Sequence, residues 1–303
     1  MDLDPVRLNF NPAGLNLLKA CIALIMFGIA LDLKGRDFAA LRKTPRASLI
    51  GIFCHLVVLP ALTIGLIHIL KPHPGLALGM VLVAACPGGN MSNFLTMLAK
   101  GNVPLSVSLT AFSDLASVFF TPLNFLFWGS LYAPTAARLK TIEVSIAEVA
   151  VSLTVMLVIP LAAGMLTNKF APQFAGKLRK PFHWLSVGLL GLFIVLALAA
   201  NFRQFLAHIN VLFFLVLVMN ASAITAGYVT AAAFRLTERD RRTIAIETGI
   251  QNSGLGLMLV FTFFNGNGAM AMICAWWGIW HLIAGGTVAL FFRSRKTTEV
   301  TPV

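Results

Sequence analysis

The sequence predicts an all-α polytopic membrane protein, and three observations support this fold class. Hydrophobic residues make up 58% and charged residues 11% of the 303 residues, whereas roughly 25% of residues are charged in an average soluble domain. The mean hydropathy is +0.86, and a soluble chain of this length does not bury so much apolar surface. The apolar runs are continuous over about 20 residues, which favours helices over a barrel of alternating strands.

Nine transmembrane helices are predicted from the apolar runs and from the basic residues between them. The helices are expected at about 13–33, 45–70, 75–99, 103–131, 143–166, 182–200, 206–233, 243–264 and 267–292. With the N-terminus outside and the C-terminus cytoplasmic, the inner loops and the tail carry most of the 23 lysines and arginines, as the positive-inside rule requires. Two of these predicted loops hold Lys169, Lys177, Arg179 and Lys180, and Arg235, Arg239, Arg241 and Arg242.

The formal net charge of +12 follows from these loops, so we expect no nucleic-acid partner. We expect an integral protein of the plasma (inner) membrane, in contact with lipid. The N-terminal segment lacks a basic region before its first apolar run, and no cleaved signal is expected. The oligomeric state is left open.

The third segment, at about 75–99, is interrupted near its middle by Cys-Pro-Gly-Gly-Asn-Met-Ser-Asn, residues 86–93. Proline removes an amide donor, adjacent glycines weaken a helix, and Asn and Ser compete for backbone groups. Unwound backbone at this depth is tolerated only where it is buried in protein or lines a polar cavity. The segment is therefore predicted to be a broken helix, with a simple kink as the alternative.

The eighth segment, at about 243–264, is interrupted by Glu-Thr-Gly-Ile-Gln-Asn-Ser-Gly, residues 247–254. A carboxylate such as Glu247 costs on the order of 3 kcal/mol at the centre of a bilayer, which makes it a functional candidate. The third and eighth segments cross the membrane in opposite senses. Two broken helices in antiparallel halves are typical of secondary transporters, in which half-helix ends and free carbonyls bind substrate and ion.

The fourth segment carries three polar residues at a spacing of four, namely Ser106, Thr110 and Asp114. This spacing places them along one face of a helix. Serine and threonine in membrane helices often only pack against neighbouring helices. Asp114 favours a functional face, because a charge inside a span needs a partner or a water-lined cavity.

These motifs resemble the bile acid:sodium symporter family over nearly the whole chain. The pair formed by residues 86–93 and 247–254 is the most specific part of the resemblance. The other matching pieces are Ile25–Leu33, Leu105–Thr110 and the dipeptide Trp280-His281.

The resemblance implies a panel and a core domain built from inverted repeats, with two crossing broken helices in the core. The chain is similar to the nine-span form of the family. A single transporter domain is then expected over 1–303, with a first repeat at about 13–131 and a second at about 143–292 that includes an extra span at 143–166.

The resemblance also implies two sodium sites. The first would use Ser92, Asn93, Ser106, Thr110 and Glu247. The second would use Glu247, the backbone oxygens of Thr248 and Ile250, Gln251, and the position of His55. Sodium ions are the expected coupling ions, and no organic cofactor is expected.

His55 and Asp114 depart from the family pattern. The family normally has a glutamine at the position of His55, and small polar residues are commoner at the position of Asp114. One interpretation is that His55 bonds a neighbouring helix and Asp114 braces the core. The other is that His55 with Asp114 or Glu247 forms a proton-coupling group, because histidine titrates near neutrality, so that a proton replaces or joins one sodium ion.

The resemblance implies sodium-coupled symport of an organic anion, either bile-acid-like or a small carboxylate, by alternating access. Asn90, Asn252 and His281 are the expected substrate-binding residues. The first alternative is a proton-coupled or mixed-ion transporter of the same fold, and a channel or an intramembrane enzyme are remote ones. We expect no enzyme, because HExxH, GxSxG and paired-Asp motifs do not accompany the polar residues.

Overall fold

The computed structural model describes residues 12–31, 39–141, 146–200 and 202–295. Residues 32–33 of the matched first motif, and the predicted start of a span at 143, lie outside this part of the chain. The described residues are almost entirely helical, which confirms the predicted class. Within them, the β-type pairing is a single isolated bridge between Gly88 and Gln251.

The helices follow the predicted segments closely. The first half holds α1 (Pro12–Ala30), α2 (Ala39–Lys43), α3 (Pro45–Phe53), the π-turn η2 (Cys54–Val58), α4 (Leu59–Leu70), α5 (Pro74–Ala85), α6 (Met91–Leu98), α7 (Val103–Ser130) and α8 (Ala133–Thr141). The second half holds α9 (Ile146–Leu153), the π-turn η3 (Thr154–Val158), α10 (Ile159–Phe170), α11 (Pro172–Ala200), α12 (Phe202–Ala233), α13 (Glu238–Gly249), α14 (Ser253–Phe263) and α15 (Gly268–Ser294).

Five helical stretches of the described chain are long and apolar enough to cross a membrane. They are Pro45–Leu70, Val103–Ser130, Val151–Phe170, Leu206–Ala233 and Gly268–Ser294. The halves of the broken helices are too short to cross a membrane singly; Pro74–Ala85 and Ser253–Phe263 are such shorter apolar helices. The count of nine spans and the inverted repeats stay predictions.

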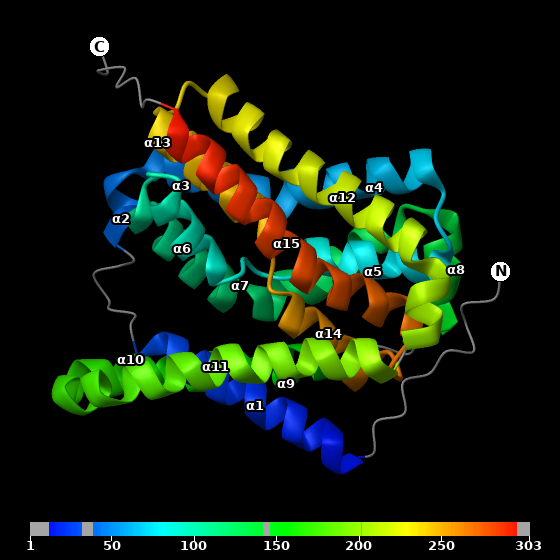
Figure 1. The fold of residues 1–303 in the computed structure, drawn as a ribbon, viewed down its shortest axis with the longest axis horizontal. Coiled ribbons are helices and arrows are strands. Elements are labelled where there is room, and N and C mark those ends of the chain that lie inside the picture. Colours follow the sequence, from blue (N-terminus) through cyan, green and yellow to red (C-terminus); the bar gives the residue numbers. More distant parts are fainter. Residues whose placement is uncertain (1–11, 32–38, 142–145, 201, 296–303) are drawn as a thin grey trace.

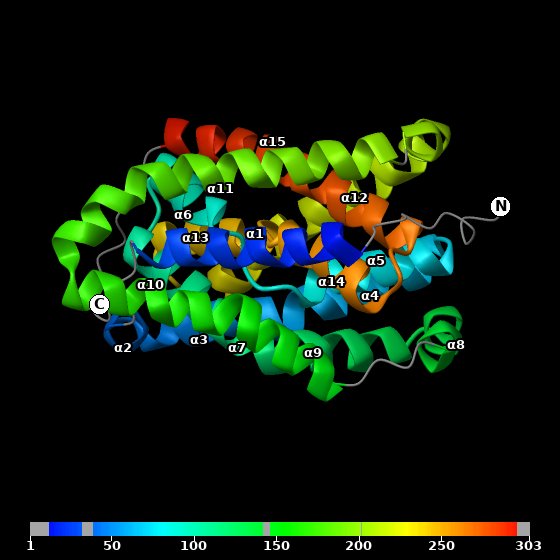
Figure 2. The same cartoon turned by 90° about the horizontal axis from the view of Figure 1, so that it is seen from below.

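The helices are arranged in two layers. In Figure 1 the helices α1, α9, α10 and α11 lie together at the bottom, apart from the larger group above them. Figure 2 shows the smaller layer face-on, with α1 between α11 and the rod formed by α9 and α10. Contacts between α1, α10 and α11 hold this layer together. The larger layer contains both broken helices.

The predicted loop between the fifth and sixth spans is wrong in extent. Helix α10 ends at Phe170 and α11 begins at Pro172, so Lys177, Arg179 and Lys180 lie on a helix. Proline at the first helical position favours this early start, because it has no amide hydrogen to leave unpaired. Arg179 donates from Nη2 to Asn168 Oδ1 at 2.9 Å, across the junction of α10 and α11.

Helix α5 lies in the interior of the larger layer. All its residues from Gly75 to Ala85 are buried, as expected of a helix that is apolar on every side. It packs against α15, α7 and α4. The first half of this broken helix is therefore enclosed by protein, which is the environment that unwound backbone at its end requires in a membrane.

Candidate functional site

Both predicted helix breaks are present, and the two unwound segments pair with each other. Residues 86–90 separate α5 from α6, and residues 250–252 separate α13 from α14. Gly89 donates its amide to Ile250 O at 2.8 Å, and the Asn252 amide donates to Pro87 O at 2.9 Å. Each break therefore satisfies backbone groups of the other.

The glycines allow the two chains to approach this closely. A Cβ atom at Gly89 would lie 3.0 Å from Gln251 O. A Cβ atom at Gly88 would lie 3.2 Å from Glu247 Oε2 and 3.4 Å from Ser113 Oγ. The absence of a side chain thus brings the first break against the carboxylate of the second broken helix.

The Glu247 carboxylate is surrounded by hydroxyl groups from two other helices. Glu247 is 4% exposed, and Ser92 donates to its Oε1 at 2.5 Å. Ser106 also donates to Oε1, and the Thr110 hydroxyl lies 3.3 and 3.2 Å from Oε1 and Oε2. The carboxylate of α13 therefore contacts α6 and α7 at once.

Asn93 completes this oxygen cluster. Its Oδ1 lies 2.9 Å from Ser106 Oγ and 3.4 Å from Thr110 Oγ1, while the Ser92 and Thr110 hydroxyl oxygens are 3.2 Å apart. The hydroxyl groups have one proton each, which is too few to fill all these close oxygen–oxygen approaches. Converging oxygens with few protons between them favour a hard cation. The structure thus brings the whole first predicted sodium set together.

The second predicted sodium set is engaged differently. Gln251 Nε2 donates to Thr248 O at 3.0 Å and lies 3.4 Å from Glu247 O, and Ile250 O already accepts the Gly89 amide. The backbone oxygens of this set therefore accept hydrogen bonds from the protein. Gln251 Oε1 is buried and has no partner among the described residues.

His55 lies close to the bridge but bonds the backbone. Its Nε2 lies 3.2 Å from Cys86 O, and only a donor nitrogen can pair with a carbonyl. Cys86 follows the last residue of α5, where helix carbonyls lack intrahelical partners. His55 belongs to the π-turn η2, which precedes Pro60. Because proline has no amide hydrogen, Leu56 O is free to accept from Asn124 Nδ2 at 3.1 Å.

A pocket reaches Glu247 from the side of α3 and α7. Most of its wall is apolar, and its polar lining comes from three side chains. The lining residues are Gly51, Ile52, His55, Leu56, Leu109, Phe112, Ser113 and Glu247. His55 and Glu247 therefore share one pocket.

Asp114 lies one helical turn beyond Thr110 on α7 and is 1% exposed. Neither of its carboxylate oxygens has a hydrogen-bond partner among the described residues. No hydrogen bond in the described chain therefore supports the interpretation that Asp114 braces the core.

The three predicted substrate residues lie around the bridge. Asn90 immediately precedes α6, and its side chain makes no capping bond. Asn252 precedes α14, accepts the Leu255 amide at 3.1 Å, and keeps a buried Nδ2 without a partner in the described chain. His281 is 6% exposed, and its Nδ1 is likewise without a partner.

Helical spacing places His281 on the face of α15 that meets both breaks. On that face, Cys274 lies against Gly256, which also faces Cys86, and Gly285 lies against Ile250. His281 falls between these positions, seven residues after the first and four before the second, and such positions share one helix face. Trp277 shares it too, and its buried Nε1 has no partner in the described part. No sequence motif pointed to this residue.

Two further residues near the site were missed by sequence reasoning. Ser113 accepts the Gly88 amide at 3.0 Å, so it holds the first break in place; its spacing of three from Thr110 was the available signal. Arg242 was assigned to a loop, and that assignment is wrong, because it lies in α13 and is 1% exposed.

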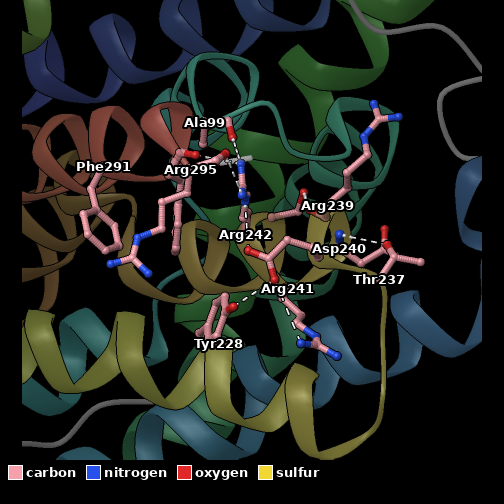
Figure 3. A network of polar contacts seen from close by, with 12 residues as sticks. Ala99, Tyr228, Thr237, Arg239, Asp240, Arg241, Arg242, Phe291 and Arg295 are labelled. Carbon is pink, nitrogen blue, oxygen red and sulfur yellow. Dashed lines mark hydrogen bonds and ion pairs between the residues drawn. The ribbon is translucent and has the colours of Figure 1, made fainter. Parts of the chain in front are cut away.

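Arg242 joins the ends of three helices, as drawn in Figure 3. It donates to Phe292 O at 2.8 Å and Ala99 O at 3.1 Å, which are carbonyls at the C-terminal ends of α15 and α6. Its Nε pairs with Glu238 at 3.0 Å, and Glu238 also accepts from Tyr228 of α12 at 2.8 Å. The C-terminal end of α6 and the N-terminal part of α13, which both lie away from the bridge, are thereby held together.

The chain is similar to known transport proteins over most of its length. The family described as "Sodium Bile acid symporter family" matches residues 19–208. The chain is 31% identical over 277 residues, covering 90% of this chain and 82% of the relative, to "Uncharacterized sodium-dependent transporter YocS" of Bacillus subtilis (strain 168).

Plant proteins are similar as well. The chain is 28% identical over 281 residues to "Probable sodium/metabolite cotransporter BASS2, chloroplastic" of Oryza sativa subsp. japonica, covering 92% of this chain and 64% of that protein. It is 28% identical over 284 residues to the protein named BASS1 of Arabidopsis thaliana, covering 94% of this chain and 68% of that protein. These relatives are transporters and not enzymes.

Proposed function

This chain belongs to the Sodium Bile acid symporter family, and from that premise we propose that it carries a small organic anion across the membrane together with sodium, by alternating access. The family and the matched relatives support a sodium-coupled membrane transporter. The anion, the ion site and the transport cycle are our proposal.

The sodium ion binds among Glu247, Ser92, Asn93, Ser106 and Thr110. The main observation that supports this site is the close approach of their oxygens. There are more close oxygen–oxygen approaches than hydroxyl protons to lie between them. A monovalent cation there offsets the buried negative charge of Glu247, whose isolation from water is otherwise costly. Because the ligands come from α6, α7 and α13, the ion links both broken helices.

One sodium ion is sufficient for this proposal. The second predicted set, of Glu247, Thr248, Ile250, Gln251 and His55, has its backbone oxygens in hydrogen bonds with the protein. A second ion there requires those bonds to open.

The anion binds on the side of the bridge that faces α15. Helices α6 and α14 both begin at the bridge, and a helix N-terminus attracts negative charge through its free amides and its dipole. The unpartnered Nδ2 of Asn252 and Nδ1 of His281 offer further donors to a carboxylate, and Asn90 lies at the start of α6. A bile-acid-like anion and a small carboxylate both have this chemistry.

Alternating access arises from motion of the two layers relative to each other. The smaller layer, α1 with α9 to α11, packs largely on itself, and the cluster and the bridge belong to the larger one. Sodium binding organises the bridge, and the anion then binds before the layers move. In this proposal the chain is one transporter domain with inverted repeats, its N-terminus is outside, and it resides in the plasma membrane.

A thermal-stability screen of purified protein tests this function. Organic anions, including bile acids and small carboxylates, are added in NaCl and in KCl of equal ionic strength. We expect at least one anion to raise the melting temperature more in NaCl than in KCl, because a ligand of the folded state stabilises by mass action. Sodium-dependent uptake of that anion into proteoliposomes then confirms transport, whereas stabilisation that is equal in both salts contradicts it.

A further inference from the structure

The carboxyl group of Asp114 is the most unusual buried group of the described chain. It is 1% exposed, and both its oxygens lack a hydrogen-bond partner. An ionised carboxylate without a partner is too costly to keep in an apolar interior, and such a group takes up a proton instead. The packing around Asp114 therefore favours the neutral acid.

Among the described residues, no neighbouring group offers the positive charge that would replace this proton. Glu247 interacts electrostatically with Asp114 and has the same sign. His55 lines the same pocket as Ser113 of α7 and donates its Nε2–H to Cys86 O. Of the helices packed against α7, α13 has its buried Arg242 paired with Glu238, and Glu148 on α9 is exposed and acidic. The basic residues of α2 and α3, Arg42, Lys43 and Arg46, are exposed to the surroundings.

The surroundings of Asp114 fit a proton and not a metal ion. Sodium needs several converging oxygens, as the Glu247 cluster provides. The Asp114 oxygens have no hydrogen-bond partner in the described chain, and one carboxylate alone supplies too few ligands. A proton needs only the carboxylate itself.

Asp114 also lies where the two layers meet. It follows Thr110, which contacts the Glu247 carboxylate, by four residues, and Ala111 by three. Ala111 packs in one cluster with Ala30 of α1 and Leu161 of α10. Positions three and four apart share a helix face, so Asp114 lies between the cluster and the smaller layer.

We propose that Asp114 is a proton-binding site of the transport cycle, which is protonated while the layers are packed as in this structure and releases its proton to water when they separate. In the release step the O–H bond of the acid breaks, the electron pair stays on Asp114, and the proton passes to solvent. The link to transport rests on the proposed function. The proton site itself depends only on the packing, and it is assigned to Asp114 and not to His55.

The first test is infrared spectroscopy of the purified full chain in KCl near neutral pH. The wild type is expected to show the C=O stretching band of a protonated carboxyl, which Asp114→Asn removes and His55→Gln keeps. Asparagine has the shape of the neutral acid, so this variant is expected to fold. A spectrum in which Asp114→Asn leaves the protonated band intact overturns the proposal.

The second test compares the melting temperatures of the wild type and Asp114→Asn from mildly acidic to mildly alkaline pH. A group that must hold a proton in the native state stabilises less as the pH rises. We therefore expect the melting temperature of the wild type to fall with pH relative to that of Asp114→Asn. Parallel profiles overturn the proton site. A wild type that does not respond to NaCl while this difference persists in KCl contradicts the proposed sodium function and leaves the proton site standing.

Discussion

Gly88 and Gln251 pair as an antiparallel bridge although they lie on different broken helices. The bridge joins the ends of α5 and α13 to the starts of α6 and α14. Helix C-termini attract cations and N-termini attract anions, so both kinds of helix end meet at one point. The proposed sodium and anion sites lie on two sides of this point.

A methyl group at Gly89 is expected to disrupt the bridge. In Gly89→Ala the new Cβ would lie 3.0 Å from Gln251 O and 3.2 Å from its carbonyl carbon, and backbone atoms there have little room to shift. We expect a loss of roughly 1–3 kcal/mol of stability from overpacking and weaker sodium binding. Gly286→Ala on α15 is the control, because nothing lies within 4 Å of its new methyl. Equal melting temperatures in the two variants contradict the account.

Removing one hydroxyl of the oxygen cluster is expected to weaken sodium binding. Ser106→Ala removes a group that contacts both Glu247 Oε1 and Asn93 Oδ1. Hydrogen bonds and ligand contacts to charged groups contribute about 1.5–3 kcal/mol, so we expect roughly a tenfold to hundredfold weaker apparent sodium affinity. Sodium titration of the melting temperature measures it. Ser130→Ala, at the exposed end of the same helix, is expected to bind sodium as the wild type does.

His281 is expected to affect the anion and not the ion. His281→Ala removes a buried ring nitrogen that lacks a partner in the described chain, and losing such a donor to an anion costs about 1.4 kcal/mol, or tenfold in affinity. We expect a higher KM for the anion found in the screen, with sodium stabilisation retained. His68→Ala, whose side chain is exposed and bonds its own helix, serves as control. A variant that loses its response to sodium but keeps its KM contradicts this assignment.

Arg242 is expected to be needed for the stability of the larger layer. Arg242→Ala removes the closer of the two ion pairs of Glu238. It also removes the side-chain donor to the carbonyls of Ala99 and Phe292. Removing one partner of a buried pair costs about 3–5 kcal/mol, which a lower melting temperature reports. Arg293→Ala, on the exposed face of the same end of α15, is expected to change stability by less than about 0.5 kcal/mol. A small effect of Arg242→Ala would show that the three helix ends are held by other contacts.

The positions of the helices and of both breaks could be predicted, because apolar runs and the Pro-Gly-Gly and Glu-x-Gly-x-Gln-Asn sequences act locally. The gathering of Ser92, Ser106 and Glu247 came from the family resemblance, since composition and spacing carry no information on distant contacts. The pairing of Gly88 with Gln251 and the hydrogen bond of His55 to Cys86 O depend on tertiary approach. The burial of Arg242 was missed because a basic residue among other basic residues near a loop resembles a topological charge until its carbonyl partners are known.

The response of Glu247→Gln to sodium tests the central claim most directly. Glutamine keeps the shape of the side chain but removes the charge that the cluster offers to a cation. The melting temperatures of the wild type, Glu247→Gln and the exposed-site control Glu148→Gln are compared in NaCl and in KCl of equal ionic strength. We predict that sodium raises the melting temperature of the wild type and of Glu148→Gln but not that of Glu247→Gln. A sodium-dependent rise of the same size in Glu247→Gln would contradict a sodium site at this carboxylate.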